Sequence, residues 1–337
     1  MTTIFPLSIV TPPDPAGATE RSEAIELAAV RGGVITIGNF DGVHRGHAEL
    51  LRHVRRLADE IGGPAVAVVM DPHPATILRP HLAPKRLTWI ERRAELMDVH
   101  GIDGLVVCET NRRFLGMTAT EFFDSLVQDH LKARAMVEGP NFFFGRDRGG
   151  DIRRLGSMCG DSGIDLKIVE PTNEDGRMIS STRIRGLLSD GDVLAANQLL
   201  GHPHRIRGSV VAGAKRGRQI GFPTANLTQI DVVIPALGVY GGRVTIDGKE
   251  YGAAIHVGPV PTFEDSGETK VEVHVLNYDG DLYGRQLEID FLHHVREIVR
   301  FDSTEALISQ LHQDISTIRS ALNLPLGEQD ESGASQD

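Results

Sequence analysis

The ten residues GNFDGVHRGH at positions 38–47 join a strand-like run to a helix-like run. The run before them, Val34 to Ile37, is apolar, and the run after them, from about Ala48 to Ile61, has apolar residues at helical spacing. A strand, a glycine-bearing turn and a helix N-terminus make an anion site, because free N–H groups and the helix dipole point at whatever docks there. His44 and His47 are three residues apart, so both imidazoles point to one side if the helix has begun. This stretch therefore predicts a site where two cationic or hydrogen-bond-donating side chains act on a phosphate group.

Strand-like and amphipathic runs alternate over the first half of the chain on both sides of this stretch. The strand-like runs are residues 34–38, 64–70, 104–109, 135–139 and 166–170. They are apolar on both faces, as strands of a covered parallel sheet are. We therefore expect an α/β fold, a Rossmann-like open sheet with its ligands at the strand C-terminal ends. Residues 1–30 hold a proline-rich start and then a short helix-like stretch.

The pattern changes near residue 200. Two short helices, at about 182–188 and 193–200, precede strand-like pieces at 207–213, 238–246, 251–258, 270–278 and 285–292. Alternation and glycine-bearing turns predict a small antiparallel β-barrel or sandwich, followed by a C-terminal helix over 301–322. The expected domains are 1–186, a helical linker at 187–203, a barrel domain at 204–325 and a disordered tail at 326–337.

Length and charge narrow the function. The 337 residues suggest two domains, and the formal net charge is −11. That balance argues against a nucleic acid or an anionic membrane as the main partner, although a local basic pocket is compatible with it. Two cysteines give no disulfide framework, and no apolar run reaches the ~18 residues of a membrane span. We expect a cytoplasmic protein of undetermined oligomeric state, a monomer or a weak oligomer.

Polar or glycine-bearing clusters follow three more of the predicted strands. DPHP at 71–74 places Asp71 at the same sheet edge as His44, and GPNFFFG at 139–145 offers aromatic rings to a planar ligand. ISSTRIR at 179–185 opens a helix with hydroxyls and guanidinium groups that suit a polyphosphate: Ser181, Thr182, Arg183 and Arg185.

Each cluster also has a plain structural interpretation. The histidine pair resembles part of a zinc site, hydroxyls before a helix are usually caps, and phenylalanines are usually core. Their coincidence at one sheet edge favours a ligand site. We find no signature of a covalent nucleophile, so direct in-line displacement at phosphorus is expected, with the protein supplying position and charge.

The second half contains a basic glycine-rich stretch, RGSVVAGAKRGRQIGFPTAN, at 207–226. Glycines let backbone N–H groups approach phosphate closely. Thr224 and Asn226 are two apart, so on an extended segment both face one way as hard oxygen ligands for Mg²⁺. Glu272 lies on a probable strand, where a carboxylate can take a hydroxyl proton. A solvated turn, turn hydrogen bonds and a solvent-facing glutamate are the alternatives.

Together, GNFDGVHRGH, DPHP, GPNFFFG and ISSTRIR resemble the adenylyltransferase half of the prokaryotic bifunctional riboflavin kinase/FMN adenylyltransferase (FAD synthetase) family. That half belongs to the nucleotidylyltransferases, and their HxGH motif corresponds to residues 44–47 of this chain. The resemblance implies catalytic roles for His44, His47 and Arg183. It implies nucleotide or flavin binding by Gly38, Asn39, Phe40, Asp41, Asp71, Asn141, Ser181, Thr182 and Arg185.

The glycine-rich half resembles the riboflavin kinase domain of the same family. The resemblance implies that Thr224 and Asn226 hold ATP and Mg²⁺ and that Glu272 is the catalytic base. Gly213, Lys215 and Gly221 would belong to the same ATP site. The chain departs from the family pattern at some positions: His256 stands where asparagine is common, and Asn141 where either Asp or Asn occurs.

The expected function is phosphorylation of riboflavin to FMN by ATP, followed by adenylylation of FMN to FAD with release of pyrophosphate. Three alternatives stay open at this point. They are an FMN adenylyltransferase with a weak or inactive kinase half, a flavin-binding or storage protein, and a nucleotidylyltransferase for another substrate.

Overall fold

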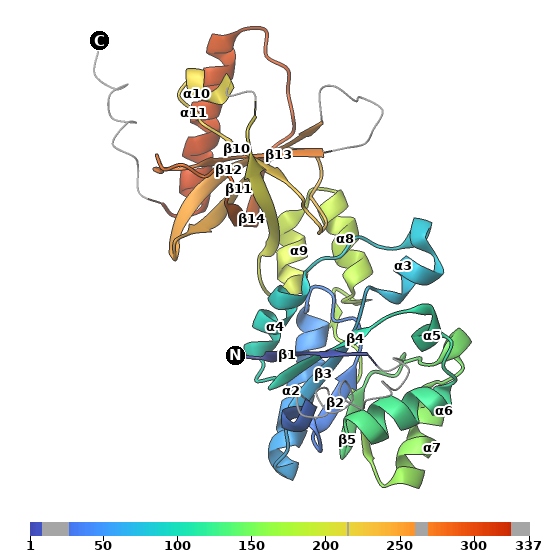
Figure 1. Cartoon of the computed structure of the whole chain (residues 1–337). Coiled ribbons are helices and arrows are strands. Elements are labelled where there is room, and N and C mark those ends of the chain that lie inside the picture. Colours follow the sequence, from blue (N-terminus) through green and yellow to red (C-terminus); the bar gives the residue numbers. More distant parts are fainter. Residues whose placement is uncertain (9–26, 214–215, 260–268, 325–337) are drawn as a thin grey trace. The chain divides into compact units, whose positions relative to one another are not determined.

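The computed structural model describes residues 1–8, 27–213, 216–259 and 269–324 (Figure 1). Contacts divide the chain into two compact units, each described by itself. The sheet unit consists of residues 1–85 and 89–180, and the barrel unit of residues 86–88 together with 181 onward. The proline-rich stretch, Lys215 and the expected tail at 326–337 lie outside the described residues.

The sheet unit is built on one parallel sheet. Its strands are β1 (Thr3–Leu7), β2 (Val34–Ile37), β3 (Ala65–Asp71), β4 (Gly104–Glu109), β5 (Ala135–Glu138) and β6 (Asp165–Ile168). Their order is β1-β4-β3-β2-β5-β6, and every neighbouring pair is parallel. The predicted α/β fold is confirmed. Because the chain leaves β2 toward β3 on one side and reaches β5 on the other, the order reverses between β2 and β5, where open sheets bind their ligands.

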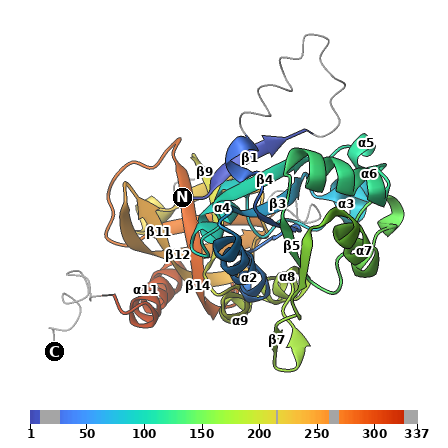
Figure 2. The ribbon, with the colours of Figure 1, turned by 90° about the horizontal axis from the view of Figure 1, so that it is seen from below.

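Helices cover both faces of this sheet (Figures 1 and 2). On one face lie α2 (Arg45–Ile61) and α4 (Ile90–Asp98), and on the other α5 (Arg112–Leu115), α6 (Ala119–Phe122), the π-helix η3 (Phe123–His130) and α7 (Ile152–Ser162). Two core clusters result, one per face, because successive strand residues point to opposite sides. Val34 joins the cluster with α2, and Ile35 joins the cluster with α7.

Short elements complete the unit: η1 (Leu27–Val30), α3 (Pro74–Leu78), η2 (Pro80–Leu82), η4 (Arg146–Arg148), β7 (Asn173–Glu174) and β8 (Arg177–Met178). Figure 2 shows the β7–β8 hairpin projecting from the sheet unit.

Two edge strands differ from the sequence-based expectation. Residues 3–7 were not expected to be a strand, yet β1 pairs with β4. Pro6 masks its strand character, but an edge strand tolerates proline because one side of its backbone needs no partner. The strand β6 was expected to be covered on both faces and is largely exposed, since it forms the other edge.

The barrel unit contains a closed six-stranded antiparallel barrel. Its strands are β9 (His204–Val211), β10 (Ala225–Thr228), β11 (Gly238–Ile246), β12 (Lys249–Pro259), β13 (Thr269–Val275) and β14 (Gln286–Arg296). The order is β10-β13-β12-β11-β14-β9, which confirms the expected barrel. The strand β10 was not expected as a strand, because it has only four residues; it closes the barrel between β9 and β13.

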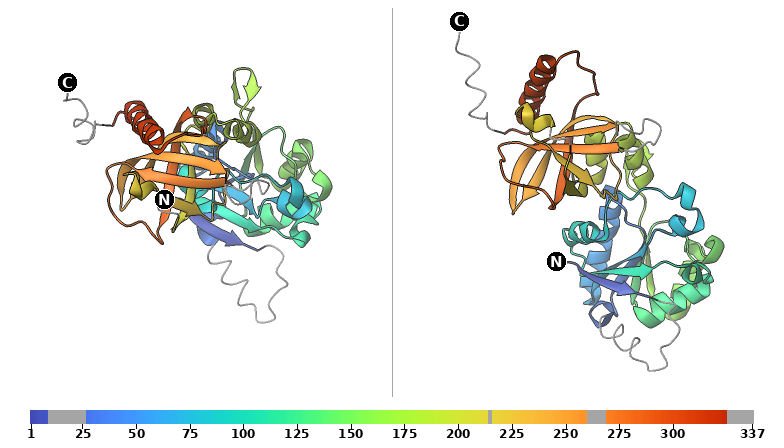
Figure 3. Two further views of the ribbon diagram at one scale, coloured as in Figure 1. Left: turned by 90° about the horizontal axis from the view of Figure 1, so that it is seen from above. Right: turned by 45° about the horizontal axis from the view of Figure 1, so that its top comes forward.

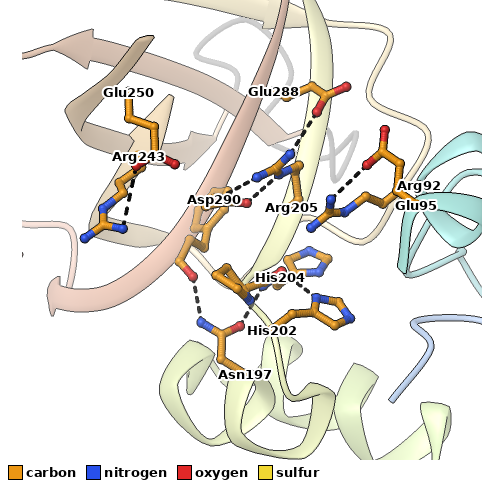
Figure 4. A network of polar contacts seen from close by, with 12 residues as sticks. Arg92, Glu95, Asn197, His202, His204, Arg205, Arg243, Glu250, Glu288 and Asp290 are labelled. Atoms are coloured by element: carbon orange, nitrogen blue, oxygen red, sulfur yellow. Dashed lines mark hydrogen bonds and ion pairs between the residues drawn. The ribbon is translucent and has the colours of Figure 1, made fainter. Parts of the chain in front are cut away.

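Helices flank the barrel: α8 (Ser181–Ser189), α9 (Val193–Leu200), α10 (Arg216–Gln219) and α11 (Thr304–Ala321). A polar network joins α9 to β9 and β14 (Figure 4). Asn197 donates to the Phe291 carbonyl at 2.8 Å and accepts from His204 N–H at 2.7 Å. Arg205 on β9 pairs with Asp290 and Glu288 on β14, which fixes the register of the two strands. Among the helices in the described ranges, none combines the length and apolarity needed to cross a bilayer.

The helix α11 packs against the outside of the barrel (Figure 3). Ile318 is fully buried, and a Cβ on Gly241 of β11 would come within 3.1 Å of its side chain. Asp314 accepts from Arg296 of β14 at 2.9 and 2.8 Å. Both the buried Ile318 and this ion pair therefore hold the helix against the barrel.

We predict that Ile318→Ala destabilises the protein by about 2–5 kcal/mol, the usual cost of truncating a fully buried isoleucine. Urea denaturation followed by circular dichroism measures the change. Ser316→Ala, at an exposed position of the same helix, is the control and should change stability by less than about 0.5 kcal/mol. Equal small losses in both variants would mean that Ile318 does not anchor α11.

Candidate functional sites

The turn between β2 and α2 has a strained backbone. Phe40 and Val43 have φ angles of 45° and 37°, in the left-handed region that β-branched residues such as valine avoid. Both side chains are buried in the core cluster beneath α2, at 1% and 2% exposure. Core packing therefore offsets the strain, and strain of this kind is concentrated at functional sites.

A buried ion pair fixes the same turn. Asp41 accepts from Arg93 Nη2 of α4 at 3.1 Å, and both side chains are nearly inaccessible. Arg93 Nη1 also donates to the Asn39 carbonyl at 3.1 Å. Sequence reasoning missed Arg93. The sequence carried a signal for its burial, because Arg93 lies on the apolar face of a helix together with Ile90, Ala94 and Met97.

The two histidines stack at the start of α2. Their ring centroids are 3.6 Å apart and their planes 14° from parallel. His44 caps the helix: its Nδ1 accepts from His47 N–H at 3.3 Å. A Cβ on Gly46 would lie 3.2 Å from the His44 ring, so glycine keeps this position clear for the ring.

Burial, then the neighbouring His44, then Arg93 lower the pKa of His47 well below its ordinary value. The sequence had suggested two cationic or donor histidines. In the free protein His47 is an uncharged hydrogen-bond donor, because burial beside Arg93 disfavours a second positive charge.

A cavity of about 260 Å³ opens where the histidines lie, at the C-terminal ends of β2 and β5. Five of the predicted residues line it: Gly38, Phe40, His44, His47 and Asn141. Glu138, Thr172 and Ile179 line it as well and were not singled out from the sequence. Asn39, Asp41 and Asp71 are not among the lining residues. Asp41 holds the turn through Arg93 instead.

The DPHP segment meets the turn through a histidine. Asn39 Nδ2 and His73 Nε2 are 2.9 Å apart, and His73 Nδ1 accepts from Ala75 N–H at the start of α3. The segment that follows β3 therefore contacts the turn that follows β2 through His73.

The aromatic loop at 139–145 divides its three rings. Phe144 is buried in the core, and its ring stacks with that of Phe142 at 5.4 Å. Phe142 lines the cavity. Phe143 is exposed, with the Arg148 guanidinium 4.0 Å above its ring. One of the three rings is thus positioned to meet a ligand in the cavity.

The remaining predicted residues of this site belong to the barrel unit. Ser181, Thr182, Arg183 and Arg185 lie on α8, two or more residues after Ile179, the last residue that lines the cavity. Their roles stay a prediction.

In the barrel unit, three polar residues form a row across neighbouring strands. Asn226 of β10 pairs with Glu272 of β13, and Glu272 pairs with His256 of β12. Their strand neighbours Ala225, Val273 and Ile255 are buried in the barrel, so the row faces outward.

Glu272 is the charged centre of this row. Its carboxylate contacts Lys270 Nζ at 2.7 Å and His256 Nδ1 at 3.5 Å. These contacts, with His256 first, lower the pKa of Glu272 to about 2. The carboxylate is therefore ionised at neutral pH, and it is a weak base.

Gly213 covers Asn226 closely. A Cβ at Gly213 would come within 2.2 Å of Asn226 Nδ2, so only glycine fits there. Gly221 has a φ of 88°, and Lys215 lies outside the described residues. Thr224 lines a second cavity of about 220 Å³ at one end of the barrel, with Arg218, Tyr278, Asp279, Asp281 and Tyr283. Asn226 and Glu272 are not among its lining residues.

Buried polar atoms without a hydrogen-bond partner occur in both candidate sites, at the turn after β2 and in the polar row of the barrel. Within the described parts of the chain, eight buried side-chain nitrogen or oxygen atoms have no hydrogen-bond partner. Three of them belong to residues above that have no other contact at that atom: Asn39 Oδ1, His47 Nδ1 and Asn226 Oδ1. Buried polar groups are nearly always paired, so a bound ligand would give these three atoms the partner they lack.

The fold and the sites define a two-unit enzyme class, a nucleotidylyltransferase sheet domain with a kinase-type barrel. The family model described as FAD synthetase matches residues 27–183, and that described as riboflavin kinase matches residues 200–322.

Relatives that match most of the chain point to the same family. A bifunctional riboflavin kinase/FMN adenylyltransferase of Pseudomonas fluorescens is 38% identical over 86% of this chain and 93% of its own. That of Escherichia coli K12 is 35% identical over 89% and 96%. A solved structure described as a macrolide-efflux protein from Streptococcus pneumoniae has a TM-score of 0.81 at 30% identity, covering 94% of this chain and 99% of that one. The chain belongs to the bifunctional riboflavin kinase/FMN adenylyltransferase family, as its motifs predicted.

The lowered pKa of His47 predicts a pH-dependent stability. Below the ordinary histidine pKa of about 6.5, the unfolded chain binds a proton at this residue that the folded protein does not bind, so stability falls as pH falls. His47→Gln should lose less unfolding free energy than wild type between about pH 7.5 and about pH 5.5. The single tryptophan, Trp89, is buried in the sheet unit and reports its unfolding by fluorescence. Identical pH dependence in both proteins would contradict an uncharged His47 in the folded protein.

Proposed function

We propose that the barrel unit transfers the γ-phosphoryl group of ATP to the 5′-hydroxyl of riboflavin, and that the sheet unit transfers the adenylyl group of a second ATP to the resulting FMN. The observation that carries this proposal is the coincidence of unpartnered buried polar atoms with the two motif regions, one in each unit. The family membership supports the same two reactions.

In the sheet unit, the phosphate of FMN attacks the α-phosphorus of ATP and pyrophosphate leaves. The first turn of α2 and the stacked histidines line the cavity, so they would stabilise charge that develops on the phosphoryl oxygens. His47 enters the reaction uncharged, and a bound triphosphate favours its protonated form. Arg183, Arg185, Ser181 and Thr182 would add positive charge and hydroxyl donors from α8, as the motif resemblance implies.

Magnesium is part of the proposal for both reactions. When bound, Mg²⁺ neutralises phosphate charge. In the barrel unit, Thr224 and Asn226 are the proposed ligands, with Gly213, Lys215 and Gly221 in the surrounding ATP site. The buried, unpartnered Oδ1 of Asn226 fits this role, because Mg²⁺ prefers oxygen ligands and a buried oxygen without a partner is costly.

Glu272 is the proposed catalytic group of the kinase reaction. A base works best when its pKa is near the working pH, so a pKa of about 2 makes Glu272 a poor proton acceptor. In phosphoryl transfer, however, positioning the nucleophile contributes more than removing its proton early. We therefore assign Glu272 to orienting the riboflavin hydroxyl while its carboxylate is held by Lys270 and His256.

We also propose that the enzyme acts in the cytoplasm, where ATP for both reactions is available. Its partners would then be riboflavin, FMN and ATP.

His47→Ala should reduce FAD formation from FMN by about 10²–10³-fold, because it removes a donor aimed at developing charge. Riboflavin phosphorylation, measured on the same preparation by chromatography of the flavins, should stay within about twofold. Arg56→Ala, at an exposed position of the same helix, is the control. Loss of both activities in His47→Ala would contradict separate sites.

Glu272→Ala should have the opposite effect, abolishing FMN formation from riboflavin and sparing FAD formation from added FMN. Glu250→Ala, an exposed acid on β12, serves as the control. If wild type forms FAD from FMN but forms no FMN from riboflavin, the kinase half is inactive and the two-reaction proposal is wrong.

A further inference from the structure

The sheet unit contains a buried acid that the mechanism above does not use. Glu138 is the last residue of β5, is 2% exposed and lines the cavity together with His44 and His47. Acids are rarely this buried without a partner of opposite charge. Its position at the carboxyl end of a central parallel strand is where open sheets bind ligands.

Glu138 lies where the sheet splits. The strands β2 and β5 pair only at Val34↔Ala135 and Ile35↔Met136, whereas β5 stays paired with β6 up to Glu138 itself. Beyond the last pair, Ile37 N–H donates to Glu138 Oε1 at 2.7 Å. The carboxyl group thus occupies the gap between the two strands and takes the place of a ladder hydrogen bond.

The surroundings favour an uncharged carboxyl group. Burial raises the pKa of Glu138 well above its ordinary value, and the Ile37 N–H is the single opposing effect. The titratable groups around it are Cys159 of α7, whose pKa burial and Glu138 raise to about 11, and the cavity residues His44, His47 and Glu170. None of these interactions lowers the pKa of Glu138. A neutral carboxyl group offers one O–H donor in addition to the acceptor that Ile37 uses.

We propose that Glu138 is a substrate-contacting residue of the adenylyltransferase site, where its carboxylic acid O–H donates a hydrogen bond to a phosphate oxygen of ATP or FMN. The cavity takes anionic substrates, and an ionised carboxylate there would repel them. A neutral acid placed at the same point contributes a donor without that repulsion. The inference rests on the proposed adenylyltransferase activity of the sheet unit.

The test compares Glu138→Gln and Glu138→Ala with wild type, after wild-type FAD formation from FMN and ATP has been established. Glutamine keeps a neutral donor and an acceptor for Ile37 N–H, whereas alanine keeps neither. Glu109→Gln, an exposed acid at the carboxyl end of the parallel strand β4, is the matched control. Circular dichroism and riboflavin phosphorylation show whether each variant is folded.

We expect Glu138→Ala to lower kcat/KM for FAD formation by about tenfold to a hundredfold, the effect of one hydrogen bond to a charged group. Glu138→Gln should stay within about threefold of wild type near neutral pH. As pH rises and Glu138 ionises, wild-type kcat/KM should fall, and Glu138→Gln should lack that fall.

Binding identifies which phosphate is contacted. Calorimetric titration of wild type and Glu138→Gln with ATP alone and with FMN alone, at neutral and alkaline pH, should show pH-dependent weakening for one ligand in wild type only. Equal pH profiles of wild type and Glu138→Gln would overturn the proposal, as would losses in Glu138→Gln as large as those in Glu138→Ala. If wild type forms no FAD, the adenylyltransferase assignment itself fails, which is a separate outcome.

Discussion

The sheet unit depends on one strained turn that the core holds in place. Phe40 and Val43 adopt left-handed backbone angles because their side chains are buried beneath α2. Arg93 adds a buried ion pair with Asp41 and a hydrogen bond to the Asn39 carbonyl. With the turn fixed from inside, His44 caps α2 and His47 stacks on it, so both imidazoles line the cavity before any substrate arrives. Such preorganisation spares the reaction the cost of ordering its donors.

The barrel unit positions its polar side chains by regular antiparallel strand pairing. Antiparallel register places Asn226, Glu272 and His256 in one outward-facing row, and Gly213 leaves room for the asparagine. Lys270 and His256 hold Glu272 ionised, which limits its strength as a base and favours a positioning role. The two units thus fix their polar groups differently, one by a strained turn and the other by strand pairing.

Much of this architecture was predictable because its signals are local. Apolar runs identified the central strands, and alternation with glycine-bearing turns identified the barrel. Prediction was wrong where context overrides local signal. Pro6 disguised the edge strand β1, β10 was too short to recognise, and β6 is exposed at the sheet edge. Among site residues, His44, His47, Gly38, Phe40 and Asn141 do line the cavity, whereas Asp41 supports the turn and Arg93 and Glu138 were missed.

The amino-acid sequence by itself determined the two-part α/β and barrel organisation, the family and the motif residues, since each of these is encoded in short stretches with fixed spacing. Only the tertiary structure decided which polar groups are buried, which are paired and which are left without a partner. The ionised state of Glu272, the uncharged state of His47 and the burial of Glu138 all depend on atoms contributed by segments far apart in the chain. Burial and electrostatic coupling are properties of those contacts, and no spacing of residues along one segment specifies them.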